Sequence, residues 1–212
     1  GKSLSVHQVE IVYTDGTAFY QFFMLFNSTD TAKRLPLKAA FITDEDQFTD
    51  SKNKEYDLDA LIVNNYENLN TLRSNINSGS VNGRVNNMNA MKNGQADIRV
   101  CSGKKTLEYQ VCRANVNASK DETKESWLYK LIKDENPDGI GKVDTYLGTL
   151  GDGAMSDEQQ QNVALLMWKC LPGKAGFAQT LNAFLLDKLE LGGDVKFTVP
   201  TYICDAINHL VP

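Results

Sequence analysis

Residues 96–113 read Ala96-Asp-Ile-Arg-Val-Cys-Ser-Gly-Lys-Lys-Thr-Leu-Glu-Tyr-Gln-Val-Cys-Arg113. Two runs containing Ile, Val, Leu and Tyr, which are common in strands, flank a Ser-Gly-Lys-Lys centre that is typical of a turn. We therefore predict a β-hairpin that turns at residues 102–105. This hairpin would make the first half of the chain rich in β-structure.

A second hairpin is predicted at the N-terminus. Residues 9–13 are Val-Glu-Ile-Val-Tyr, and Asp15-Gly16 is a turn signal. Residues 18–26 are apolar at nearly every position, which fits a strand covered on both faces. The run is either a buried central strand or a surface that a partner subunit covers.

Helices are predicted elsewhere from apolar residues at spacings of three and four. The clearest helix of the first half spans residues 56–77 and ends at Ser78-Gly79-Ser80. Residues 78–95 form either a long loop or a loose segment with a short helix at 85–92. After Ser119 the chain is helical, with capping residues at Ser119 and Ser156.

The resulting fold class is α+β, with a β-rich N-terminal half that contains one long helix and a helical C-terminal half. The first part covers residues 1–118 and includes the helix at 56–77 and a basic segment at 73–117. The second part covers residues 119–212. We expect the two parts to form one compact unit.

Composition is that of a globular protein, since 42% of the 212 residues are hydrophobic. The chain lacks an apolar run of about 18 residues, so we expect no membrane insertion. The predicted hairpin would place Cys101 roughly 20 Å from Cys112, too far for a disulfide. We therefore expect reduced thiols, which favours a cytoplasmic or virion-associated protein over a secreted one.

Charge is distributed in three blocks, although the chain as a whole has a net charge of −5. Residues 1–72 contain 6 Lys or Arg and 11 Asp or Glu, and residues 121–212 contain 8 and 14. Residues 73–120 contain 8 basic and 2 acidic residues, so this block alone is positive. One basic surface on an acidic protein can bind a polyanion locally, or an acidic surface of another copy.

The candidate nucleic-acid-binding residues follow from this block. Cations that track phosphates and an aromatic ring that stacks on a base would suit single-stranded nucleic acid. The residues are Arg73, Arg84, Lys92, Arg99, Lys104, Lys105, Arg113 and Tyr109. The alternative is a solvated surface that happens to lack acidic residues.

A metal site is a weaker candidate. Asp134, Asn136 and Asp138 have the spacing that opens a calcium loop, and Gly139 stands where that loop turns sharply. The twelfth position is Thr145, where a calcium loop needs a bidentate glutamate. The alternative is a helix end followed by a Pro-Asp-Gly turn. Calcium is the one cofactor that the sequence suggests.

Nucleophile-elbow, P-loop, dinucleotide and zinc-protease motifs do not occur in the sequence, so we expect no enzyme. The first hypothesis is a non-enzymatic assembly or binding protein, for example a component of a coat or a nucleocapsid. Its basic segment would contact nucleic acid or another polyanion, and its apolar first hairpin and end segments would contact other copies. The second is a protein-interaction module, secreted and stabilised by calcium, that binds no nucleic acid. The third is an enzyme whose site the sequence does not reveal.

Overall fold

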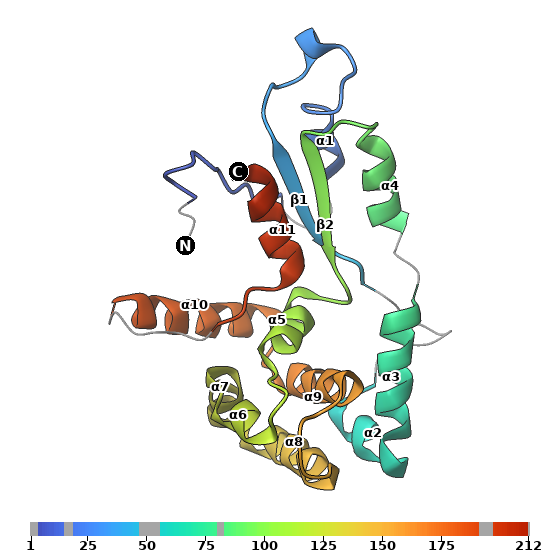
Figure 1. Ribbon diagram of the computed structural model, residues 1–212, viewed down its shortest axis with the longest axis vertical. Coiled ribbons are helices and arrows are strands. Elements are labelled where there is room, and N and C mark those ends of the chain that lie inside the picture. Colours follow the sequence, from blue (N-terminus) through green and yellow to red (C-terminus); the bar gives the residue numbers. More distant parts are fainter. Residues whose placement is uncertain (1–3, 15–18, 47–55, 80–82, 191–196, 212) are drawn as a thin grey trace. The chain divides into compact units, whose positions relative to one another are not determined.

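The computed structural model describes residues 4–14, 19–46, 56–79, 83–190 and 197–211 (Figure 1). Helix accounts for 61% of the structure and strand for 7%, and one two-stranded parallel sheet is present in the described residues. The prediction of an α+β fold with a β-rich first half is therefore wrong, since the protein is mostly helical from end to end.

The chain forms two compact units, and each is assembled from separate segments. Unit 1 contains Gly1–Asp46, Ser80–Gly103 and Pro200–Pro212. Unit 2 contains Gln47–Gly79 and Lys104–Val199. The expected boundary between residues 118 and 119 lies inside unit 2.

Unit 1 is a small α/β layer structure. Its elements are α1 (Phe19–Phe23), a short 3-10 helix (Thr31–Lys33), β1 (Ala39–Asp44), α4 (Gly83–Met91), β2 (Ile98–Gly103) and α11 (Thr201–Leu210). The two strands run parallel, and Ala39 pairs in register with Ile98. Of the two alternatives left open for residues 78–95, a long loop or a segment with a short helix at 85–92, helix α4 bears out the second.

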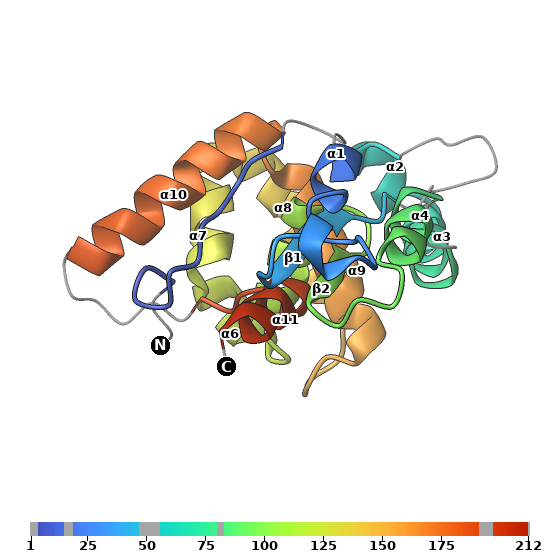
Figure 2. The ribbon, with the colours of Figure 1, turned by 90° about the horizontal axis from the view of Figure 1, so that it is seen from above.

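Helices cover both faces of this sheet (Figures 1 and 2). On one face Phe23 of α1 stacks on Phe41 of β1 with ring centroids 3.9 Å apart, and Met88 of α4 joins them. On the other face α11 packs across both strands, and Tyr202 and Cys101 are buried together there. A parallel sheet requires such cover, because its side chains are apolar on both sides.

The N-terminal hairpin does not form. Residues 9–14 form neither helix nor strand, the Asp15-Gly16 turn lies outside the described residues, and residues 19–23 are helical. A helix allows the apolar run to bury one side only, so within α1 Phe23 is fully buried whereas Tyr20 is 38% exposed. Composition alone could not separate this case from a strand.

Among its described residues, unit 2 contains helices joined by loops and no strand. Its elements are α2 (Leu58–Ile62), a 3-10 helix (Asn64–Tyr66), α3 (Glu67–Ser78), α5 (Leu107–Asn115), α6 (Lys120–Glu125), α7 (Trp127–Glu135), α8 (Pro137–Thr149), α9 (Asp157–Cys170) and α10 (Lys174–Glu190). Helix α9 is central, because α3, α5 and α8 all pack against it. Residues 162–167 are buried all round the helix, as expected of a core helix.

Two predicted elements of unit 2 differ from the structure. The second strand of the 96–113 hairpin is helix α5, which Thr106 caps by accepting a hydrogen bond from the Tyr109 amide. The long helix at 56–77 is broken, because Asn64, Asn65 and Tyr66 adopt left-handed backbone conformations. Tyr66 then packs edge-on against Tyr146 of α8, so the break lets this ring reach the core.

The predicted caps of the C-terminal helices are confirmed. Ser156 and Gln159 form a reciprocal capping box at the start of α9, and the Ser119 side chain accepts a hydrogen bond from the Glu122 amide. All four cysteines are free, and Cys101, Cys112 and Cys170 are buried. The hairpin argument for free thiols was nevertheless wrong, since Cys112 lies in a helix.

Candidate functional site

The basic segment is divided between the two units. Arg84, Lys92 and Arg99 belong to unit 1. Arg73, Lys104, Lys105, Arg113 and Tyr109 belong to unit 2. Continuity in sequence therefore does not make these residues one continuous surface.

Within each unit, most of these arginines pair with carboxylates from the acidic flanks. In unit 1 Arg84 contacts Asp46 at 2.9 Å and also donates to the Asp44 carbonyl at 2.8 Å. Arg99 lies 3.7 Å from Asp205. The acidic and basic blocks of the sequence thus neutralise each other locally.

Unit 2 shows the same pairing. Arg73 lies 3.3 Å from Glu158 and donates to the buried Asn162 side chain at 3.2 Å. Arg113 pairs with Asp157, so two carboxylates of the first turn of α9 each hold one arginine. These arginines link α3 and α5 to α9. Exposed ion pairs contribute only about 0–1 kcal/mol each to the free energy of unfolding.

The remaining candidates of unit 2 have local roles. Lys104 donates to the Asn77 carbonyl at 3.4 Å, and Lys105 is only 5% exposed. Tyr109 is 3% exposed and lies edge-on to Trp168, so its ring presents no free face for stacking in this conformation. Burial raises the pKa of Tyr109 to about 12.

The calcium-loop candidates form a helix start. Asn136 caps α8 by accepting from the Gly139 amide at 2.9 Å, and it donates to the Cys170 carbonyl at 3.1 Å. Pro137 occupies the first turn of α8, while Asp134 and Asp138 are exposed. Across the described ranges, no three His, Cys, Asp or Glu side chains are grouped as a metal site. Calcium binding here stays a prediction.

Exposed apolar side chains are the most unusual feature of the described surface, and they concentrate in the smaller unit. Unit 1 exposes Val6, Ile11, Val12, Tyr13, Tyr20, Met24, Leu25, Leu35, Leu37 and Ile42. Unit 2 exposes Val63, Leu107, Leu186 and Val199. Single exposed apolar residues are ordinary, whereas a concentration of them indicates an interaction surface.

Residues 9–14, here called the arm, contribute the two most exposed of these side chains, Tyr13 and Ile11. Ile11 is 82%, Val12 65% and Tyr13 84% exposed. The Val9 amide donates to the Leu4 carbonyl at 2.9 Å, and beyond it no hydrogen bond joins residues 10–14 to any other described residue. The arm is therefore a largely apolar segment in which the backbone groups of residues 10–14 make no hydrogen bond to other described residues.

The sheet of unit 1 offers a second available backbone. No described strand other than β2 pairs with β1. The Ala39 amide donates to the Asp97 carbonyl at 2.9 Å, so in a parallel ladder the alternate residues Ala40 and Ile42 direct their amides away from β2. Ile42 is also 41% exposed, which leaves an apolar side chain beside this open edge.

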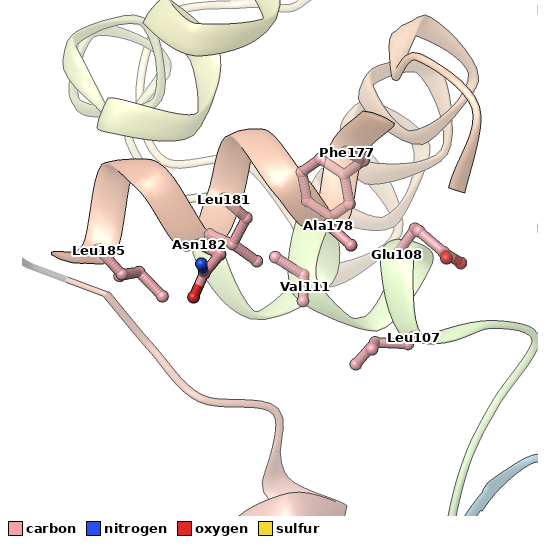
Figure 3. A pocket seen from close by; sticks show the side chains of 8 residues that line it. All are labelled: Leu107, Glu108, Val111, Phe177, Ala178, Leu181, Asn182 and Leu185. Carbon is pink, nitrogen blue, oxygen red and sulfur yellow. The ribbon is translucent and has the colours of Figure 1, made fainter. Parts of the chain in front are cut away.

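Unit 2 contains an apolar groove between α5 and α10 (Figure 3). Its volume is about 240 Å³. It is lined by Leu107, Glu108, Val111, Phe177, Ala178, Leu181, Asn182 and Leu185. Within the described structure the buried Glu108 Oε2 has no hydrogen-bond partner, but no convergent set of polar groups accompanies it. The groove therefore has the character of a packing surface rather than of a catalytic site.

Sequence reasoning expected the first apolar segments to contact other copies, but it placed them in a hairpin. The arm and the β1 edge were missed as separate features. The signal for the arm was present, because Ile11-Val12-Tyr13 is apolar at successive positions and thus suits neither a one-sided strand nor a solvated loop.

No helix in the described part of the chain combines the length and the apolar character needed to cross a membrane. Comparison with protein-family models, with curated proteins and with solved structures found no match to this chain.

Proposed function

We propose that this chain is a non-enzymatic assembly protein that associates with other copies through unit 1. The observation that carries the proposal is the concentration of exposed apolar side chains on that unit, to which the arm contributes Ile11, Val12 and Tyr13. Burial of apolar surface is the main driving force of protein association. Burying Ile11, Val12 and Tyr13 against a partner therefore lowers the free energy relative to leaving them in water.

Light scattering coupled to size exclusion tests self-association directly. We expect the weight-average mass to exceed the 23.6 kDa of one chain and to rise with protein concentration. Raising the salt concentration should preserve the larger species, because apolar contacts are not screened by ions. A mass of 23.6 kDa at every concentration would rule the proposal out.

Contact with nucleic acid or another polyanion is the second part of the proposal. It is supported by two exposed or half-exposed cations of unit 1. Lys92 forms no ion pair within the described residues, and Arg99 has a 3.7 Å pair whose two side chains are each 48% exposed. A phosphate can displace such a weak pair, because exposed pairs contribute little free energy.

Fluorescence anisotropy with single-stranded RNA tests this contact. We expect affinity to fall steeply as salt rises, and Lys92→Glu with Arg99→Glu to weaken binding about tenfold. Lys133→Glu is the matched control, because Lys133 is an exposed lysine of α7 outside the basic segment. Weak, salt-independent binding, or equal loss in the control, would remove the polyanion contact and leave self-association standing.

A further inference from the structure

We propose that the arm of one copy adds a strand to the open edge of β1 in a second copy. This inference rests on the proposed self-association and names the surface that receives the arm. It concerns only features of unit 1, namely residues 9–14 and the sheet of β1 and β2.

The sheet of unit 1 has two strands in the described residues, although helices cover both of its faces. Two strands without further support are only marginally stable, and parallel sheets normally contain more strands. Here α11 covers one face, and α1 and α4 cover the other (Figure 2). A third strand between the same two layers would extend an architecture that already exists.

The edge of β1 lacks the devices that normally protect an exposed strand. Such edges usually contain lysine, proline or a bulge, which prevent pairing with another chain. Strand β1 (Ala39–Asp44) contains no lysine, proline or bulge, and its one charged residue, Asp44, stands at its end. By contrast, β2 contains Arg99, a charged side chain of the kind that discourages pairing with another chain. The β1 edge is therefore the receptive one.

The arm has the properties that this edge needs. It forms no helix or strand within its own chain, and Val9, Ile11, Val12 and Tyr13 belong to the residue types favoured in strands. A strand inserted between two helical layers must be apolar on both faces, and successive residues of a strand point to opposite faces. Ile11, Val12 and Tyr13 satisfy this requirement because all three are apolar.

The area involved is sufficient for a specific contact. Three exposed side chains amount to on the order of 400 Å², since an aromatic residue buries roughly 200 Å² and aliphatic ones somewhat less. The covered surface loses a similar area. Because each copy gives one arm and receives another, the total comes to about 1,600 Å², which is the size of a standard specific interface.

A second copy is the occupant that this arrangement favours. In its own copy the arm forms neither helix nor strand and is largely exposed, and the sheet has two strands in the described residues. Main-chain hydrogen bonds between an added strand and an edge need no particular recognition sequence, so the same chain can supply both.

Cross-linking of mixed variants tests the pairing. We would mix a tagged Val12→Cys protein with an untagged Ile42→Cys protein and oxidise the mixture. A disulfide needs Cα atoms within about 7 Å, so only close pairing yields the mixed dimer. The native Cys101, Cys112 and Cys170 are buried, and Cys204→Ser in both proteins removes the fourth thiol. Circular dichroism checks that each variant is folded.

The matched control replaces Ile42→Cys with Leu186→Cys, because Leu186 is 50% exposed in unit 2. We expect at least a fivefold larger yield of mixed dimer with Ile42→Cys. Equal yields would overturn the inference. A doubly substituted Val12→Cys, Ile42→Cys protein that forms the disulfide only within one chain would overturn it as well.

Two further measurements separate this inference from the proposed function. Hydrogen exchange at residues 39–44 should slow as concentration rises, since an added strand protects the outward amides of β1. Ile42→Lys should weaken self-association at least tenfold, whereas Leu37→Lys, an exposed position outside the strand, should weaken it less. Self-association that leaves exchange and both variants unchanged would keep the proposed function and reject strand addition.

Discussion

Replacing Ile11 and Tyr13 together with aspartate is expected to leave a folded monomer that no longer self-associates. The two side chains are 82% and 84% exposed, so their loss removes almost no packing within the chain. Exposed substitutions of this kind usually change the free energy of unfolding by about 0.5 kcal/mol or less. The same charges would be buried in the complex, where an unpaired carboxylate is strongly unfavourable.

We expect the dissociation constant for self-association to rise by at least about 100-fold, which corresponds to roughly 2.7 kcal/mol. Light scattering measures the association, and thermal unfolding verifies the fold. Val6→Asp is the control, because Val6 is 77% exposed but precedes the arm. If the arm variant associates as tightly as the unaltered protein, the remaining apolar surface of unit 1 is responsible instead.

Trp127→Ala is expected to lower the free energy of unfolding by about 3 kcal/mol, as is usual when a packed aromatic ring is removed. The Trp127 ring stacks on Phe184 of α10 with ring centroids 4.9 Å apart. It also packs at a tilt against Phe197, with ring centroids 5.4 Å apart. It therefore connects α7 to α10 and to the segment that follows α10. Urea denaturation followed by circular dichroism measures the loss.

Trp127→Phe provides the comparison that isolates ring packing from hydrogen bonding. In the described structure the buried indole Nε1 has no hydrogen-bond partner, so phenylalanine loses no bond and removes an unsatisfied donor. We expect this change to cost less than about 1.5 kcal/mol. Equal losses for alanine and phenylalanine would mean that the indole N–H is essential, contrary to the packing argument.

Among the helices that the sequence predicted correctly, α9 has the clearest signals, namely a cap and an apolar stripe. Ser156 with Gln159 marks the start of α9, and Val163, Leu166 and Cys170 follow at helical spacing. These signals act within one turn, so they need no information about distant residues. Local chemistry is enough to define such an element.

The elements predicted wrongly are those whose local pattern suits two structures. In residues 106–113 polar and apolar residues nearly alternate, yet Tyr109, Val111 and Cys112 are also buried on a helix. The packing of α5 on α9 decides between them, and the local pattern does not show it. Residues 19–26 are similarly ambiguous, because an almost uniformly apolar run has no period to read.

The candidate site was beyond prediction for a related reason. The basic block is continuous in sequence, but the chain leaves unit 2 after Gly79 and returns at Lys104. Its arginines then meet carboxylates that are far away in sequence, as Arg73 meets Glu158 and Arg99 meets Asp205. Charge counts along a chain cannot reveal such neutralisation.

The division into interleaved segments has a consequence for synthesis on the ribosome. Unit 2 is complete once residue 199 has emerged, whereas unit 1 still needs residues 200–212. Until α11 arrives, the sheet face that contains Ala40 and Cys101 has no cover. Unit 2 can thus fold during translation before unit 1 is complete. The surface that we assign to assembly therefore forms after unit 2 has folded.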